Sequence, residues 1–290
     1  MKNIFRVYIY IYIYIMSLAS HKQAYNLLRT AIRSKEPYTT EEAIRIIKAK
    51  KENLNLQDDD GKTVLMHAIE FGKKEVAKTL IDAGVDLNKQ DNHGKTAVEY
   101  AIEYMPDIAK ELIIKEVDTN KKDKSGKTPL MRAILTKNKE VAIELIEKGV
   151  DLDIQDNRKR TALMYAIIIA NKEVAEKLID KGADLNIQDT YDRTALIYAI
   201  INANIEVGIK EVAEKLIDKG ADVNIQDKYN STALTYAIEY MPDIVNGEHI
   251  KTASSGEKEG GKKRKTKKGK RGKKSKDSRK KSKSKRKNRK

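Results

Sequence analysis

Residues 161–186 read TALMYAIIIANKEVAEKLIDKGADLN, and this stretch carries the start and stop signals of two amphipathic helices. Thr161 is a natural N-cap for the first helix, and Gly182 is a natural end for the second, because glycine readily adopts the left-handed conformation. The apolar residues of each helix share one face. Those residues are Leu163, Ala166 and Ile167 in the first helix, and Val174, Ala175, Leu178 and Ile179 in the second. The stretch therefore predicts a unit of helix, short turn, helix and extended loop.

The same unit recurs along most of the chain. A threonine followed two residues later by Leu or Val, and then by Ala-Ile, occurs at Thr63, Thr96, Thr128, Thr161, Thr194 and Thr232, with spacings of 33, 32, 33, 33 and 38 residues. A second block similar to EVAEKLIDKGADLN follows the first five, and residues 24–58 form a degenerate first copy. One helix pair has an apolar flank on each side and cannot bury both alone. The sequence therefore predicts about seven stacked units, of which the first and last are atypical.

These repeats resemble the ankyrin repeat family over about residues 20–245. The segment Thr128-Pro129-Leu130 matches the T-P-L-H-x-A signature best, and D-x-x-G-K-T precedes the helix at Asp58, Asp91 and Asp123. The hairpin block G-A-D-L/V-N at Gly182 and Gly220 is equally typical. The resemblance implies an all-α, ankyrin-type helix-turn-helix solenoid with hairpin loops.

The chain departs from the family pattern at several places. The signature histidine, which usually tethers neighbouring loops, is replaced by Met66, Glu99, Met131, Met164, Ile197 and Thr235, which calls that tether into question. The glycine before the first helix becomes Lys159, Asp192 and Asn230, of which Lys159 is the least suited to positive φ. Glu116 stands where a terminal glycine is expected. Five extra residues near 206–210 are expected to lengthen the second helix of that unit or the loop before it.

No pattern in the sequence supports catalysis or a cofactor. His21, His67, His93 and His249 share no metal-ligand spacing, and no nucleophile motif or phosphate-binding loop is present. The sequence DDDGK at 58–62 resembles a calcium loop, but DNHGK and DKSGK occupy the same place in the next units, so we interpret it as a turn. The sequence thus predicts a protein that is not an enzyme, with no metal, cofactor or small-molecule substrate.

The family resemblance implies that a protein partner binds the hairpin tips and the exposed part of the first helices, which together line a concave groove. Tyr191 and Tyr229 lie among polar loop residues, which favours contact with a partner. For Ile168, Ile169 and Ile201 the alternative is packing against the neighbouring repeat. The predicted partner-binding residues are Phe71, Tyr104, Arg158, Ile168, Ile169, Tyr191, Ile201, Tyr229 and Tyr240.

The charge of the chain is concentrated at its C-terminal end. Residues 251–290 hold 22 Lys and Arg against 3 Asp and Glu, whereas residues 1–250 hold 37 and 40. This segment has almost no apolar residues, so a disordered basic tail is expected. It could be a nuclear address, a non-specific nucleic-acid or polyanion binder, or a solubilising tail without a partner, and it contains no aromatic residue for base stacking. The polyanion-binding candidates are Lys262, Lys263, Arg264 and Lys265.

The N-terminal segment 1–19 contains VYIYIYIYIM at 7–16, which allows three interpretations. Alternation of β-branched and aromatic residues suggests a strand, but both faces are apolar. Lys2, Arg6 and the small residues after Met16 resemble a secretory leader. The favoured interpretation is a mis-assigned start, because an A/T dinucleotide tract read in frame gives Ile-Tyr repeats and Met16 follows directly. The chain would then divide into 1–19, the array 20–250 and the tail 251–290.

The sequence as a whole favours a non-enzymatic protein-interaction scaffold. The family resemblance further implies a viral or intracellular-bacterial protein acting on a host, because large repertoires of such proteins occur there, and a composition rich in residues with A/T-rich codons agrees. The alternative is a nucleic-acid-associated or nuclear-targeted protein that acts through its tail. The absence of cysteine fits a reducing compartment, so an intracellular monomer in the cytoplasm or, in a eukaryotic cell, the nucleus is expected. Membrane association is not expected, and secretion would follow only from a genuine leader.

Overall fold

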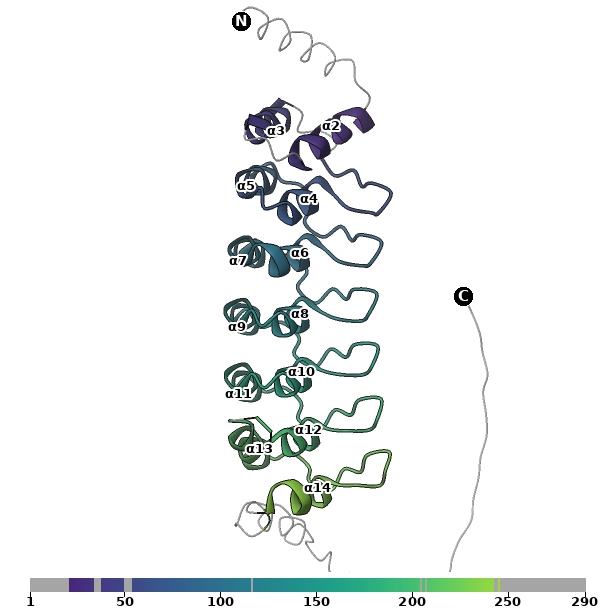
Figure 1. Cartoon of the computed structure of the whole chain (residues 1–290), viewed down its shortest axis with the longest axis vertical. Coiled ribbons are helices and arrows are strands. Elements are labelled where there is room, and N and C mark those ends of the chain that lie inside the picture. The colour runs from purple at the N-terminus through teal and green to yellow at the C-terminus, as the bar shows by residue number, and fades with distance from the viewer. Residues whose placement is uncertain are drawn as a thin grey trace, which may run out of the picture. The chain divides into compact units, whose positions relative to one another are not determined.

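The fold is a stack of helix pairs linked by hairpin loops, as a computed structural model shows for residues 21–33, 38–49, 54–115, 117–203, 205–206, 208–242 and 245 (Figure 1). No strand is found among these residues, and the predicted all-α repeat array is confirmed. We call the first helix of each pair inner and the second outer. The predicted leader 1–19, the tail 251–290 and Glu116 lie outside the described residues.

The helices follow the predicted units in order. The pairs are α2 (His21–Arg33) and α3 (Tyr38–Ala49), α4 (Val64–Glu70) and α5 (Lys74–Asp82), α6 (Ala97–Tyr104) and α7 (Pro106–Ile114), α8 (Pro129–Leu135) and α9 (Lys139–Glu147), α10 (Ala162–Ile168) and α11 (Lys172–Asp180), and α12 (Ala195–Ala203) and α13 (Ile209–Asp218). The inner helix α14 (Ala233–Tyr240) begins the seventh unit. Inner helices stack on inner helices and outer on outer, so each element meets the same kind of neighbour along the array (Figure 1).

The predicted threonine N-caps are confirmed. The hydroxyl oxygens of Thr63, Thr128, Thr161, Thr194 and Thr232 each accept the backbone N–H of the third residue of the helix, at 3.3–3.4 Å. At Thr96 the arrangement differs, because the Glu99 carboxylate accepts both the backbone N–H and the hydroxyl of the threonine. Each cap satisfies a backbone N–H that the first turn of a helix leaves without a partner.

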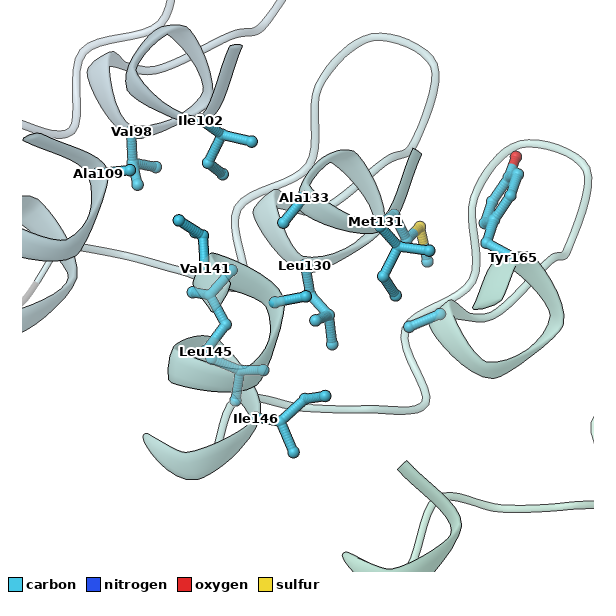
Figure 2. Packing of buried hydrophobic residues seen from close by; sticks show 14 of the residues in the cluster. Val98, Ile102, Ala109, Leu130, Met131, Ala133, Val141, Leu145, Ile146 and Tyr165 are labelled. Atoms are coloured by element: carbon cyan, nitrogen blue, oxygen red, sulfur yellow. The ribbon is translucent and has the colours of Figure 1, made fainter. Parts of the chain in front are cut away.

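The core consists of small and branched side chains that interlock between successive pairs. Figure 2 shows Leu130 and Ala133 of α8 facing Val141 and Leu145 of α9, with Ile102 of α6 on the other side. All five side chains are buried. The predicted apolar faces of the 161–186 unit are likewise fully buried. Each pair therefore shares its two flanks with its neighbours, as a solenoid requires.

The last inner helix shows what a missing neighbour changes. Leu234 and Ile238 of α14 are 38% and 62% exposed, whereas the equivalent Leu163 and Ile167 of α10 are fully buried. Among the described residues no helix pair follows α14. The residue types are the same, so it is the neighbouring unit, and not the helix itself, that buries these positions.

The extra residues of the sixth unit lengthen its second helix and the turn before it, as predicted, but they also lengthen its first helix. Helix α12 has nine residues where the other inner helices of the repeats at 63–240 have seven or eight, and α13 has ten where α11 has nine. Ile205 and Gly208 lie in the turn between them, and Gly208 adopts φ of +89°. The packed flanks of both helices are thus kept, with Ile205 and Glu206 of the longer segment exposed at the surface and Ile209 buried in the core.

Left-handed backbone occurs at the pre-helix position whether or not the residue is glycine. Gly61, Gly94 and Gly126 have φ between +75° and +79°. Lys159, Asp192 and Asn230, which replace that glycine in the later units, have φ of +57° or +58°. The repeat geometry therefore imposes the conformation on each residue, and a lysine accepts it least readily.

Replacing Lys159 by glycine should stabilise the array by about 0.5–1 kcal/mol. In the folded state, left-handed backbone costs a residue with a Cβ about 1–2 kcal/mol, and glycine avoids this cost. Glycine has more conformational freedom in the unfolded chain, however, and losing it on folding offsets about half of that gain. Urea unfolding of both chains would measure the difference. The matched control is Gly126→Ala, which should destabilise, because a Cβ at that position would lie 2.6 Å from the Asn157 nitrogen. A loss of stability in Lys159→Gly would contradict the prediction.

Candidate partner-binding surface

An aspartate five residues before each helix-capping threonine locks the hairpin to its inner helix. In the 161–186 unit, Asp156 Oδ1 accepts the backbone N–H groups of Arg158 and Arg160 at 2.8 and 2.9 Å. Its Oδ2 accepts the Tyr165 hydroxyl at 2.5 Å. Burial, together with this bond to Asp156, raises the pKa of Tyr165 to about 12, so the hydroxyl stays a donor. The carboxylate thus fixes the shape of the hairpin and its angle to the helix.

The same lock recurs in each of the six described hairpins, with a tyrosine as the partner on the helix in four of them, a histidine in one and an arginine in one. The pairs are Asp58 with His67, Asp91 with Tyr100, Asp123 with Arg132, Asp156 with Tyr165, Asp189 with Tyr198, and Asp227 with Tyr236. The histidine that stands one position late in the family pattern, His67, is therefore a buried structural residue of its own repeat. The DDDGK sequence at 58–62 is the first of these hairpins, as predicted.

Neighbouring hairpins are tied together by backbone and glutamine hydrogen bonds. The backbone N–H groups of Asn92, Lys124, Asn157, Thr190 and Lys228 each donate to a carbonyl oxygen of the preceding hairpin, at 2.8–3.1 Å. Gln57, Gln90, Gln155 and Gln188 each donate from Nε2 to a carbonyl of their own hairpin and to one of the next repeat. Glutamine thus ties neighbouring loops where the signature imidazole is absent. The Gln-Asp pair that recurs at Gln57, Gln90, Gln155 and Gln188 is the sequence signal for this ladder, which the sequence-based prediction did not include.

Basic residues at the base of the hairpins join the loops to the ends of the inner helices. Lys62 Nζ lies 2.7 Å from Glu70 Oε1, and Lys95 Nζ lies 3.0 Å from Glu103 Oε2. The last residues of the inner helices therefore lie beside the hairpins and form one surface with them. We call this surface the hairpin face; it comprises residues 59–60, 92–93, 124–125, 157–158, 190–191 and 228–229 at the tips, and 70–71, 103–104, 135–136, 168–169, 201–202 and 239–240 at the helix ends.

The nine predicted partner-binding residues all belong to the hairpin face, but they differ in exposure. Ile168, Ile169, Ile201 and Tyr240 are half-buried and pack against the core. For the three isoleucines, packing against the repeats thus accounts for much of the side chain. The exposed residues are Phe71 (40%), Tyr104 (47%), Tyr191 (48%), Tyr229 (64%) and Arg158.

Sequence reasoning missed the charged groups that accompany the exposed tyrosines. The guanidinium carbon of Arg193 lies 5.8 Å from the ring centroids of both Tyr191 and Tyr229. Lys228 Nζ lies 6.0 Å from the Tyr191 ring centroid. Arg193 and Tyr229 are far apart in the sequence and meet only because successive hairpins stack. The tips of these hairpins therefore form one cluster.

The described residues offer neither a metal site nor a membrane span. No group of three or more His, Asp or Glu side chains in this part of the chain is placed to hold a metal ion. None of the helices described here combines the length and the hydrophobicity that a bilayer crossing requires. The hairpin face carries the exposed aromatic side chains of the described residues, which are Phe71, Tyr104, Tyr191 and Tyr229.

Stacked helix pairs with projecting hairpins define a helical-repeat solenoid, a class in which each unit contacts only its neighbours. The chain belongs to the ankyrin repeat family, whose three-copy repeat pattern matches residues 28–123, 103–189 and 170–247. Ankyrin repeats are in general protein–protein interaction modules, and proteins built from them are typically non-enzymatic scaffolds. The family resemblance is thereby confirmed.

Two solved structures illustrate the likeness. The ankyrin repeat domain of Bcl-3, described as a unique member of the IkappaB protein family, superposes with a TM-score of 0.63 at 24% identity, over 76% of this chain and 97% of that one. A chain from the complex of the Bd0816 predatory endopeptidase of Bdellovibrio bacteriovorus with its immunity protein Bd3460 gives 0.53 at 31% identity, over 69% and 98%. No curated protein sequence matches the chain.

Proposed function

We propose that this protein is a non-enzymatic scaffold that binds a protein partner on its hairpin face. The observation that carries the proposal is the position of the exposed aromatic side chains. Phe71, Tyr104, Tyr191 and Tyr229 are the aromatic residues among the large apolar side chains exposed in the described part of the chain, and all four lie on this face. Aromatic side chains of this kind supply much of the binding energy at protein interfaces.

The scaffold itself does not require aromatic residues at these positions. Thr136 and Asn202 occupy the place of Phe71 in other units, and Asp60 and Ser125 occupy the place of Tyr191. The hairpins that carry Asp60 and Ser125 keep the same aspartate-centred hydrogen bonds. The aromatic residues are therefore available for contact with a partner.

The hairpins are also held in place before any partner arrives. The backbone N–H of Tyr191 donates to Asp189 and its carbonyl accepts from Lys228, while the backbone N–H of Tyr229 donates to Asp227. A side chain on such a fixed backbone loses little conformational freedom on binding. The fixed hairpins therefore favour binding of the partner to a surface that is already ordered, and not binding that requires the hairpins to fold on contact with the partner.

A rival function is association with nucleic acid through the basic tail, for which the charge of residues 251–290 is the supporting observation. In the scaffold proposal the tail serves to concentrate the protein on polyanions. Large repertoires of ankyrin repeat proteins occur in large DNA viruses and intracellular bacteria, and a composition rich in residues with A/T-rich codons agrees with such an origin; the partner would then be a host protein.

Affinity capture with the full chain tests the scaffold proposal against its rival. Replacing Phe71, Tyr104, Tyr191 and Tyr229 together by alanine should weaken retention of the captured protein at least about tenfold, because each anchor residue is worth 1 kcal/mol or more. Deleting 251–290 should leave retention unchanged. The control is Ile114→Ala, which removes a side chain that is 71% exposed at the end of an outer helix. If retention instead disappears with the tail and returns only with added polyanions, the rival function is correct.

A further inference from the structure

The tips of the last two hairpins carry a cluster in which an arginine lies between two exposed tyrosines. The Arg193 guanidinium carbon is 5.8 Å from both ring centroids, and Arg193 Nε is 3.6 Å from Asp227 Oδ2. Lys228 adds a second cation 6.0 Å from the Tyr191 ring centroid. Cation–π contacts of this kind hold the cations and the rings in a defined arrangement. The cluster is a preformed feature of two stacked repeats.

The charge exposed at these tips is predominantly positive. Asp189 and Asp227 are buried, and both of their oxygens already accept hydrogen bonds from hairpin N–H groups and tyrosine hydroxyls. Asp192 is half-buried. We call the cluster and its neighbours the basic–aromatic patch, which comprises Arg158, Lys159, Tyr191, Arg193, Lys228 and Tyr229; all but Arg193 are exposed.

The first hairpin shows that this charge does not follow from the fold. Asp59 and Asp60 are exposed at its tip, at the positions that Thr190 and Tyr191 occupy in the fifth hairpin. Both hairpins have the same aspartate-centred bonds. The charge of the tips thus changes from acidic to basic along the array without any change in backbone structure.

We infer that the basic–aromatic patch binds an extended acidic segment of the partner protein. The inference rests on the proposed function and specifies the chemistry of the partner. Carboxylates of the segment would pair with Arg158, Lys159 and Lys228, and the two tyrosines would contribute apolar contact and hydroxyl groups. Charge-assisted hydrogen bonds beside rigid aromatic anchors are a strong form of recognition.

The observations favour an acidic peptide over a single-stranded nucleic acid. Non-specific single-strand binders stack bases on open aromatic faces. Here the Arg193 guanidinium carbon lies 5.8 Å from both ring centroids and Lys228 Nζ lies 6.0 Å from that of Tyr191, so a base stacking on these rings would compete with the cations. A peptide carboxylate can instead pair with the exposed cations Arg158 and Lys159 and leave these ring contacts in place.

A photo-crosslinking experiment with the full chain tests the inference. The probe is a peptide of eight glutamates that carries a benzophenone group, used near physiological salt, with crosslinks mapped by mass spectrometry so that the patch and the basic tail are read separately. We expect crosslinks at 158–159, 191–193 and 228–229. In Tyr191→Ala/Tyr229→Ala they should fall about tenfold while crosslinks in the tail do not change.

Matched variants keep the test interpretable. His93→Ala/Ser125→Ala changes the same tip positions in two other hairpins and should have no effect on the patch crosslinks. Arg158→Glu/Lys228→Glu should abolish the patch crosslinks. This charge-reversal variant replaces the tyrosine variant as the test if Tyr191→Ala/Tyr229→Ala unfolds at a lower urea concentration than the unmodified chain. Both side chains are exposed, so this variant is expected to fold.

Three outcomes of the crosslinking experiment would overturn the inference. One is crosslinking confined to the tail, and another is patch crosslinking that survives both the tyrosine and the charge-reversal variants. The third is displacement of the probe from the patch by oligo-dT at lower concentration than by unlabelled octaglutamate, which would assign the patch to nucleic acid. A partner that is captured on the hairpin face but whose binding ignores Tyr191 and Tyr229 would leave the proposed function intact and refute only this inference.

Discussion

Replacing Asp156 by alanine should destabilise the array by about 3–4 kcal/mol, because one carboxylate serves three hydrogen bonds and each buried group left unsatisfied costs about 1–3 kcal/mol. The substitution removes the acceptor of two hairpin N–H groups and of the Tyr165 hydroxyl. Tyr165 is 5% exposed, so water cannot easily replace the carboxylate. The loss should be measured by urea unfolding.

A double-mutant cycle with Tyr165→Phe separates the contribution of the Tyr165–Asp156 hydrogen bond from that of the two hairpin N–H bonds to Asp156. The phenylalanine variant removes only the bond to Oδ2 and should cost about 1 kcal/mol. Because both changes remove the same bond, the double variant should lose less stability than the sum of the two single variants. If Asp156→Ala stays within about 1 kcal/mol of the unmodified chain, the aspartate is not the organising group of the hairpin.

Replacing Glu99 by methionine should stabilise the array by about 2–3 kcal/mol at pH 8 and remove the loss of stability that Glu99 itself causes as the pH rises from 5 to 8. Glu99 is 1% exposed, and its Oε1 has no hydrogen-bond partner among the described residues. Met66, Met131 and Met164 occupy the same place in other units and are equally buried. The scaffold therefore accepts methionine at this position.

The direction of the pH effect follows from the raised pKa of Glu99. Burial raises this pKa from 4.5 to about 7, against the two hydrogen bonds from Thr96 and the nearby charge of Arg132, which lower it. The folded chain thus holds the proton more tightly than the unfolded chain. The stability that protonation gives is complete below pH 4.5 and is lost as the pH rises through 7. The buried His67, whose pKa is lowered chiefly by burial, acts in the opposite sense, since protonation opposes folding at acidic pH.

Urea unfolding at pH 5, 6, 7 and 8 measures this prediction in both chains. The difference between Glu99→Met and the unmodified chain should be small at pH 5 and should grow toward pH 8. Glu144→Met, which changes an exposed glutamate of α9, controls for the added methionine and should show no such trend. A difference that stays constant with pH would show that Glu99 is ionised alike in the folded and unfolded chains.

The periodic features of the fold could be predicted from the sequence, because each depends on residues close together in one unit. Thr161, the apolar faces of its two helices and Gly182 lie within 22 residues, and the structure confirms their roles. The need for positive φ at Lys159 also followed from alignment with Gly126. Repetition turned each weak local signal into a strong one.

The features that were missed depend on contacts across units or on burial. The glutamine ladder joins residues of successive repeats, and the cluster of Tyr191, Arg193 and Tyr229 forms only when two hairpins stack. Glu99 stood out as a departure from the family signature, yet its burial, which raises its pKa, comes from the packed neighbouring helices. Of the candidate residues, the place of each in the repeat and the exposure of Tyr191 and Tyr229 could be expected from the sequence, whereas the half-burial of Ile168, Ile169 and Ile201 and the charge partners of the tyrosines could not.

Hydrogen–deuterium exchange of the full chain, with and without the captured partner, tests the central claim most directly. Binding on the hairpin face predicts slowed exchange at the hairpin tips and at the ends of the inner helices, with the outer helices α5, α7, α9, α11 and α13 unchanged. Slowed exchange confined to those outer helices or to residues 251–290 would contradict the claim.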